Sequence, residues 1–474
     1  MGAEREVADV KPKRLEKAFD YVDRHFDEML EELRKVCSYP STAGNPEGRE
    51  ATRRCIVSKM KSIGLDPKVY DVEGGNAIIS ADTGGEGNAA LLFYNHYDVV
   101  EPGKYENWRI NDPFHPRTID GRLYGRGVSD NKGPLYSRLH AVQAVLATEG
   151  RLPARIKFLA EGDEEISSPS LHRFALENPS LFREMTKADV CIWESGRNDD
   201  AGRMWLRLGV RGSAAFDLRV ETSDTDVHGR MGAIVPSASW RLVWALASLK
   251  TPDERIAIEG FYDGIEPPNE ADLEVLRVFP YDEEGFRKKV GFRDYVKGAA
   301  GEELKRRIYM EPSMSICGLE SGEVHSGVRG IVPHKAYARI SFYLVPNQDP
   351  SKLMGALRRH LDRQGFTDVE IEMAGGVNRP VRTPVDTPFR YRACRVAESV
   401  LDKPMVVELT QLGAGPADVF RDAWPQMPIA GIGPSHPGGN HHSPDENLIV
   451  EDYKKAIKYL IALFRSYERD VART

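Results

Sequence analysis

Apolar and polar positions form two repeating patterns in the first two hundred residues. From Leu15 to Val36 apolar side chains recur every three or four positions, which predicts an amphipathic helix. Further helices are expected over 50–63 and 132–148. Short apolar runs bounded by turn residues predict buried strands between and after them. These runs lie at 89–94, 155–159 and 189–193. The alternation predicts a largely parallel sheet flanked by helices, in which ligands bind beyond the carboxyl ends of the strands.

The pattern changes after Gly209 and returns near Tyr391. Strand-like alternation and helical spacing follow each other in a β-α-β-α-β series, which predicts a ferredoxin-like α+β sandwich. Its elements are expected at 213–220, 237–249, 336–345, 351–362 and 369–373. The charged stretch 251–312 is expected to be an elaborated connection with helices of its own. We therefore predict an α/β domain of residues 1–207 and 386–474, interrupted by a smaller α+β domain of residues 208–385.

Composition narrows the class of protein. The 474 residues carry a net charge of −7, which argues against a nucleic-acid partner, and 41% of them are hydrophobic, enough for a packed core. No stretch approaches the ~18 apolar residues of a membrane-spanning helix, and the charged N-terminus does not resemble a secretory signal. Five scattered cysteines without a CxxC pair indicate reduced thiols, so a cytoplasmic location is expected and thiolate metal ligands are not.

Five places put His, Asp or Glu at the end of a predicted strand or in the turn after it. The first is NHYD, where His96 and Asp98 face the same side of an extended backbone. Either His96 ligates a metal while Asp98 accepts its other N–H, or the pair is a solvent-facing salt bridge. The second is the glycine-rich turn GRGVSD, in which Asp130 either caps the following helix or bridges a pair of metal ions. The turn does not match a nucleotide-binding loop.

The other three places are rich in carboxylates and imidazoles. EGDEE follows a strand directly, and it is either a solvated acidic loop or a site where cations neutralise the charge. Because adjacent side chains point apart, Glu165 could ligate a metal while Glu164 handles a water proton. Glu194 ends an otherwise apolar strand. The last place, SHPGGNHHSPDE at 435–446, crowds three histidines and two carboxylates into one loop, which is either polar surface or part of the same site.

Several strings, in this order, resemble the M20 family of di-zinc metallopeptidases. They are NHYDVV, Trp108 followed by DPF, DGRLYGRGVSDNKGP, EGDEE, WES and HHSPDE. Two more, LGVRG at 208–212 and ISFYLVPNQ at 340–348, are similar to the carnosinase-type dipeptidase branch. The resemblance covers almost the whole chain. It implies a zinc-exopeptidase-like catalytic domain with a mostly parallel central sheet, interrupted by a lid and dimerisation domain.

The resemblance also implies a metal site. One ion would be held by His96, Asp130 and Glu194, and the other by Asp130, Glu165 and His442, so that Asp130 bridges two ions roughly 3.5–4 Å apart. His442 is preferred to His441 because it stands where the family places its ligand. Imidazole and carboxylate donors suit Zn²⁺, with Mn²⁺ or Co²⁺ as alternatives.

A mechanism follows from that resemblance. The metals lower the pKa of a shared water, Glu164 takes its proton as general base, and the hydroxide attacks a polarised carbonyl or similar carbon. Asp98 orients His96. The lid domain implies a homodimer in which His228 reaches the partner's active site and stabilises the oxyanion.

Departures from the family fall on the substrate side. Tyr343 stands where an arginine usually grips the substrate carboxylate, and Gly330 and Ala414 replace a usual Thr and Ser. Because a tyrosine cannot replace a bidentate guanidinium, either Arg329 or Arg230 supplies the grip or the substrate is not an ordinary dipeptide.

The expected function is cleavage of a peptide or related amide bond in a short peptide or other small molecule, without a nucleic-acid or membrane partner. The alternative enzyme is an N-acyl or N-carbamoyl hydrolase or an aminohydrolase. A non-catalytic scaffold would be expected to have lost ligands or Glu164, and this chain keeps them all.

Overall fold

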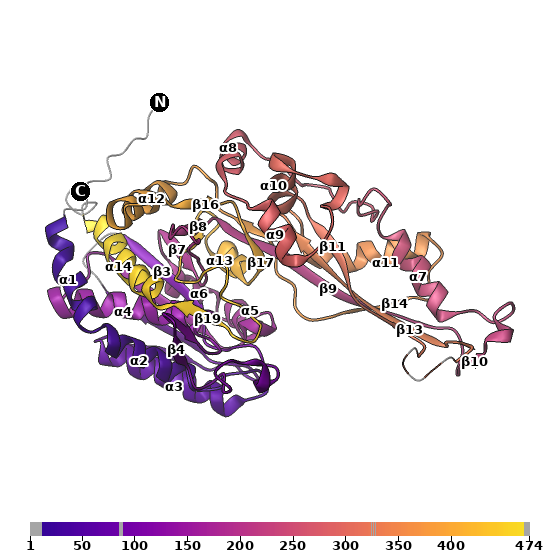
Figure 1. Cartoon of the computed structure of the whole chain (residues 1–474), viewed down its shortest axis with the longest axis horizontal. Helices are drawn as coiled ribbons and strands as arrows, with labels where there is room; N and C mark the ends of the chain where they lie inside the picture. Colours follow the sequence, from indigo (N-terminus) through magenta and orange to yellow (C-terminus); the bar gives the residue numbers. More distant parts are fainter. Residues whose placement is uncertain (1–11, 85–88, 324, 326, 328, 469–474) are drawn as a thin grey trace. The chain divides into compact units, whose positions relative to one another are not determined.

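The computed structural model describes residues 12–84, 89–323, 325, 327 and 329–468, so the charged N-terminal segment lies outside the described residues. The chain divides into two compact units (Figure 1). Unit 1 comprises Met1–Gly209, Arg382–Gln411 and Val419–Thr474, and unit 2 comprises Val210–Val381 and Leu412–Asp418. The short segment Leu412–Asp418, which contains Ala414, thus belongs to unit 2, although the residues before and after it in the sequence belong to unit 1.

Unit 1 is built on an eight-stranded sheet in the order β1-β2-β6-β3-β7-β18-β8-β16. Its centre is parallel, because β3 pairs in parallel with β6 on one side and β7 on the other, and β7 pairs in parallel with β18. The edge strands β1 and β2 are antiparallel, so the sheet is mixed. The strands are β1 (Lys68–Tyr70), β2 (Ile78–Asp82), β3 (Ala90–His96), β6 (Arg155–Glu161), β7 (Val190–Trp193), β8 (Trp205–Arg207), β16 (Val406–Glu408) and β18 (Ile429–Gly431).

Helices complete unit 1, and a small three-stranded sheet lies beside them. The apolar helix α4 (Lys132–Glu149) packs on β3 and against α14 (Val450–Ser466). The single helix predicted from Leu15 to Val36 is wrong: the structure divides it at His25 into α1 (Pro12–Arg24) and α2 (Phe26–Cys37), because His25 leaves helical geometry with φ −108° and ψ 13°. Further elements are α3 (Pro46–Ser62), α5 (Pro169–Glu177), α6 (Pro179–Thr186), α12 (Pro388–Leu401), β4 (Arg117–Ile119), β5 (Arg122–Tyr124) and β19 (Asn447–Ile449).

Unit 2 is an antiparallel sheet with helices packed against it (Figure 1). Its main strands run in the order β11-β13-β9-β14, and α7 and α11 contact β13 and β14 respectively. Every second side chain of β13 is buried, and its Phe342 packs with Phe216 of β9 in the core. The elements are β9 (Gly209–Glu221), β11 (Ser313–Ser321), β13 (Lys335–Leu344), β14 (Glu370–Met373), α7 (Ala238–Ser248) and α11 (Leu353–Arg363).

The sequence predicted three of the four strands in the main order of unit 2 and missed the fourth. β11 was not predicted, because most of its side chains are exposed and it carries almost no buried alternation. The stretch 251–312 contains helices of its own, namely α8 (Glu270–Val278), α9 (Glu283–Val290) and α10 (Gly301–Met310). In the described part of the chain, no helix has the length and apolarity required to cross a bilayer.

Candidate metal centre

The central strands of unit 1 bring three of the predicted places to one edge of the sheet. His96 is the last residue of β3, and it is 1% exposed. Glu164 and Glu165 lie in a 3-10 turn, η2 (Glu164–Ile166), just after β6, and Glu194 directly follows β7. Since β6, β3 and β7 are adjacent and parallel, their carboxyl ends meet at the same edge. The sheet topology therefore converts positions far apart in sequence into one cluster.

Two loops bring the remaining predicted ligands to this edge. Asp130 lies two residues before α4, after the glycine-rich turn, and Gly127 adopts φ +87°, which favours glycine. His442 lies in the loop that precedes β19. Its Nε2 atom is 3.2 Å from Oδ2 of Asp130 and 3.1 Å from Oε2 of Glu165.

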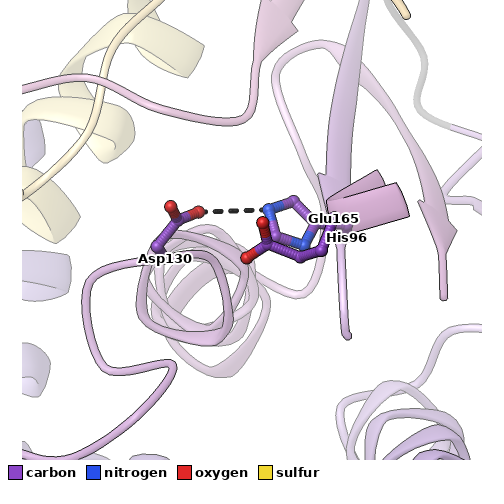
Figure 2. A group of neighbouring side chains, drawn as sticks. All are labelled: His96, Asp130 and Glu165. Carbon is purple, nitrogen blue, oxygen red and sulfur yellow. Dashed lines mark hydrogen bonds and ion pairs between the residues drawn. The ribbon is translucent and has the colours of Figure 1, made fainter. Parts of the chain in front are cut away.

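Asp130 lies between two groups of potential ligands. Its Oδ1 atom is 3.1 Å from Nε2 of His96, and Figure 2 shows the two side chains facing each other with Glu165 beside the imidazole ring. The same Nε2 atom is 3.6 Å from Oε2 of Glu194. His96 and Glu194 thus lie on the Oδ1 side of Asp130, whereas Nε2 of His442 lies within reach of both its Oδ2 atom and Glu165.

Glu164 also lies within this cluster. Its Oε2 atom is 4.0 Å from Nε2 of His96, and donor atoms of His96, Glu164 and Glu194 lie close enough to hold a single ion. A second such group is formed by His96, Asp130 and Glu165. By geometry alone, Glu164 is therefore close enough to act as a metal ligand and is also positioned to act as a general base.

Crowding of carboxylates shifts the pKa values of the cluster. Burial raises the pKa of Glu164 well above its usual value, and the charge of Glu194 adds to this effect. Burial likewise raises the pKa of Glu194 to about 7. Burial opposes ionisation of Asp130 too, yet hydrogen bonds with His442 and His96 hold its pKa well below the usual value. Hydrogen bonds with Asp130 and Glu165 raise the pKa of His442 to about 10.

The donor set fits divalent metal ions. Four acidic side chains stand around two imidazoles, which leaves an excess of negative charge in a place largely shielded from water. Two carboxylate oxygens, Oε1 of Glu165 and Oε2 of Glu194, are buried without a hydrogen-bond partner among the described residues. A buried oxygen without a donor is costly unless a cation satisfies it. Nitrogen and oxygen donors without thiolate suit Zn²⁺, Mn²⁺ or Co²⁺.

Asp98 and His441 make hydrogen bonds to residues of the cluster and of the loops that carry it. Nδ1 of His96 lies 3.1 Å from the backbone oxygen of Asp98 and 3.3 Å from its Oδ1 atom. Oδ2 of Asp98 accepts a hydrogen bond from the backbone N–H of Glu165 at 3.0 Å. Nε2 of His441 lies 2.9 Å from the hydroxyl of Ser129 and 2.6 Å from that of Ser435. Asp98 thus joins the His96 ring to the turn that carries Glu165.

Glu446 ends the SHPGGNHHSPDE string, and no role for it is predicted from the sequence. Its side chain is fully buried and accepts hydrogen bonds from the backbone N–H groups of Ser129 and Asp130, both at 2.9 Å. It also accepts from the N–H of Gly127 at 3.0 Å and from Nη1 of Arg126 at 2.7 Å. Glu446 therefore holds the turn that positions Asp130.

The predicted oxyanion and substrate residues all belong to unit 2, whereas the residues of the metal cluster all belong to unit 1. His228 ends the short strand β10 (Val227–His228), is exposed, and accepts from the backbone N–H of Arg230 at 3.2 Å. Gly330 accepts a backbone hydrogen bond from Gly229 at 2.6 Å, so the segments of His228 and Gly330 are adjacent within unit 2. The remaining four are Arg230, Arg329, Tyr343 and Ala414, and Tyr343 is 42% exposed on β13.

A family profile, a curated relative and solved structures all relate the chain to peptidases. The sequence profile described as "Peptidase family M20/M25/M40" matches residues 92–466. The chain is 27% identical to the Beta-Ala-His dipeptidase of Rattus norvegicus over 478 residues, which covers 95% of each chain. The structure of the M20 family metallo-carboxypeptidase Sso-CP2 from Sulfolobus solfataricus is similar with a TM-score of 0.87 at 30% identity, covering 93% of this chain and 99% of that one. Human carnosine dipeptidase 1 gives a TM-score of 0.79 at 25% identity, covering 96% and 99%.

Proposed function

The chain belongs to peptidase family M20/M25/M40 and is a metal-dependent hydrolase of C–N bonds, and on this premise we propose that it is a two-metal dipeptidase. The observation that carries the proposal is the position of Asp130 at the carboxyl edge of the sheet, with one carboxylate oxygen 3.1 Å from Nε2 of His96 and the other 3.2 Å from Nε2 of His442. Solved relatives described as a metallo-carboxypeptidase and a carnosine dipeptidase support a small peptide substrate.

We assign His96, Asp130 and Glu194 to one divalent ion and Asp130, Glu165 and His442 to the other, with Zn²⁺ as the expected metal. When bound, such ions polarise the scissile carbonyl and make water acidic enough to be deprotonated near neutral pH. Asp98 keeps the His96 ring oriented, and it ties the backbone of Glu165 to the same position.

Glu164 is assigned the proton transfer. Its carboxylate lies at the edge of the cluster, and burial together with the charge of Glu194 raises its pKa, so it can hold a proton during the reaction. It takes the proton of the attacking water and returns it to the leaving nitrogen. His228 is assigned to the oxyanion, from the partner subunit of a homodimer.

A panel of dipeptides tests the proposal. The metal-loaded enzyme should release free amino acids, and Glu164→Gln should lower kcat by about 10²–10⁴-fold, the usual contribution of a general base. Metal content should stay unchanged in that variant. The exposed Glu177→Gln serves as the matched control and should retain full activity. A Glu164→Gln enzyme that retains activity would exclude Glu164 as the base.

A second candidate function is hydrolysis of an N-acyl, N-carbamoyl or amino-substituted small molecule. Tyr343, in place of an arginine, favours it, because a half-exposed phenol cannot grip a carboxylate in two places. Hydrolysis of such compounds, together with no hydrolysis of any dipeptide, would favour this alternative.

We infer a homodimer formed through unit 2 and a cytoplasmic location. The outer face of α7 exposes Trp240 and Trp244, whose stacked rings lie 5.7 Å apart, and exposed aromatic pairs of this kind are typical of interfaces. All five cysteines are free thiols, which agrees with a reducing compartment.

A further inference from the structure

A cavity of about 320 Å³ lies beside the metal cluster, wholly within unit 1. Asp130 and Glu194 form part of its wall, and two guanidinium groups, those of Arg197 and Arg207, form another part. Cations are an unusual lining for a site that already has to hold metal ions. Guanidinium groups bind carboxylates with paired hydrogen bonds, so this part of the wall suits an anionic group of a ligand.

Arg207 is held in place by a neighbouring strand. It ends β8, and it lies directly opposite Glu408 of the parallel strand β16. Its Nε atom donates to Oε2 of Glu408 at 2.8 Å, and Glu408 is 2% exposed. Among the described residues the Arg207 side chain donates a hydrogen bond to a protein acceptor only through Nε, although it is only 15% exposed. One edge of the guanidinium is therefore anchored, and the other edge is available to a ligand.

A glycine leaves the space in front of Arg207. Gly431 of β18 stands between Trp193 of β7 and Arg207 of β8 in the register of the sheet. A Cβ atom at this position would lie 2.3 Å from the backbone oxygen of Ser195 and 3.3 Å from Cβ of Arg207. Any larger residue would therefore crowd the strand end that carries Arg207.

Arg197 adds a second cation to the cavity. Its guanidinium carbon lies 3.7 Å from the centre of the Trp205 ring, so the planar group stacks on the indole. Its Nη2 atom is 3.9 Å from Oε1 of Glu408. Two guanidinium groups thus approach the carboxylate of Glu408 from within the same cavity. Stacking reduces the conformational freedom of Arg197 and prepares it for planar recognition.

We propose that this cavity is a carboxylate subsite, in which Arg207, assisted by Arg197, binds an anionic group of the substrate next to the metal centre. The inference rests on the proposed hydrolase function and names its substrate class: a short peptide or amide that carries a carboxylate on the Glu194 side. Guanidinium–carboxylate pairs of this kind are strong and directional. The subsite also offers a substitute for the arginine that Tyr343 replaces, and it comes from unit 1 rather than from Arg230 or Arg329.

The carboxylate can be the terminal group of a peptide or an acidic side chain, and kinetics with four substrates separates the two. The substrates are Ala-Ala, Ala-Ala-amide, Glu-Ala and Ala-Glu. A terminal carboxylate in the subsite predicts that Ala-Ala-amide is a poor substrate with a high KM. An acidic side chain predicts that Glu-Ala or Ala-Glu is preferred over Ala-Ala. Equal kcat/KM for all four substrates would overturn the proposal.

Substitution of Arg207 tests its role directly. Arg207→Met should lower kcat/KM for the preferred substrate about 10–100-fold, mainly through KM, and should leave the substrate without the recognised carboxylate unaffected. Arg207→Lys keeps the charge but loses the planar fork, so an intermediate loss is expected. Arg203→Met is the matched control, because Arg203 pairs with Asp199 at 2.7 Å outside the cavity lining and should have no effect.

A binding measurement separates this inference from the proposed function. In the metal-loaded Glu164→Gln protein, calorimetric titration with the same four compounds measures affinity without turnover. Weaker binding on addition of Arg207→Met supports the subsite if it is confined to the compounds that carry the recognised carboxylate, even if the wild-type enzyme hydrolyses none of them. These compounds are Ala-Ala, Glu-Ala and Ala-Glu for a terminal carboxylate, and Glu-Ala or Ala-Glu for an acidic side chain. Equal losses for all four compounds would overturn it. The double variant Arg207→Met/Glu408→Gln removes both charges of this ion pair together, so it guards against a result caused by misfolding.

Discussion

Replacement of Glu446 by glutamine is the most informative single perturbation of the metal centre outside its ligands. Glu446 accepts four hydrogen bonds, three from the backbone of the turn 127–130 and one from Arg126. The ion pair between Arg126 and Glu446 is fully buried, with side-chain exposures of 1% and 0%. Glutamine has the same shape, but it removes the charge and turns one acceptor oxygen into an N–H₂ donor.

The magnitude follows from these contacts. Ser129 and Asp130 donate to one oxygen of Glu446, and Gly127 and Arg126 donate to the other. In either orientation, the NH₂ group of a glutamine would therefore face two hydrogen-bond donors in place of an acceptor. Breaking a buried ion pair on one side only costs about 3–5 kcal/mol. Since the turn carries Asp130, the affinity for metal should fall by about 10–100-fold, as is usual when a group that orients a ligand is lost.

Two assays measure the effect. Urea denaturation of the metal-free protein gives the change in the free energy of unfolding, and titration with Zn²⁺ against a chromophoric chelator gives the change in affinity. The exposed Glu451→Gln is the control and should stay within about 0.5 kcal/mol of the wild type. A Glu446→Gln protein with a stability loss below about 1 kcal/mol and unchanged metal affinity would refute this account of the turn.

Three further predictions concern other parts of the molecule. Chelation should abolish hydrolysis and lower Tm, and titration of the metal-free protein should restore both at two ions per chain; saturation at one ion would contradict a bridging Asp130. Burial lowers the pKa of His140 from 6.5 to about 4, so the folded state resists protonation of this side chain more than the unfolded state does. The resulting contribution to the free energy of unfolding, about 3 kcal/mol, is complete above pH 6.5 and is lost as the pH falls to 4. His140→Gln should consequently lose that much less stability between pH 7 and 4 in urea titrations, and an unchanged pH dependence would show that other groups cause the loss. Trp240→Arg combined with Trp244→Arg should convert the dimer to monomer in sedimentation, and a persistent dimer would place the interface elsewhere.

Local sequence patterns predicted the elements that position the metal cluster. β3, β6, β7 and α4 each have a strong period or a continuous apolar run, and burial in the centre of the sheet depends on just that property. The chemistry-bearing residues stand at the strand ends, so a correct strand also places its His or Glu. Boundaries were less predictable: β3 continues to His96 and α3 begins at Pro46, where Asn45 caps the backbone N–H of Gly48.

The sequence by itself thus determined the order of the elements, the family and the residue types of the candidate metal centre. Tertiary structure alone decided which distant residues support them. Glu446 meets Arg126 across 320 positions of the chain, and Arg207 meets Glu408 across 201. Such pairings depend on strand register and loop closure, which cannot be read from the local spacing of apolar residues. The exposed strand β11 likewise depends on its pairing with β13 rather than on apolar spacing, and the break at His25 leaves no signal in the apolar spacing that continues through it.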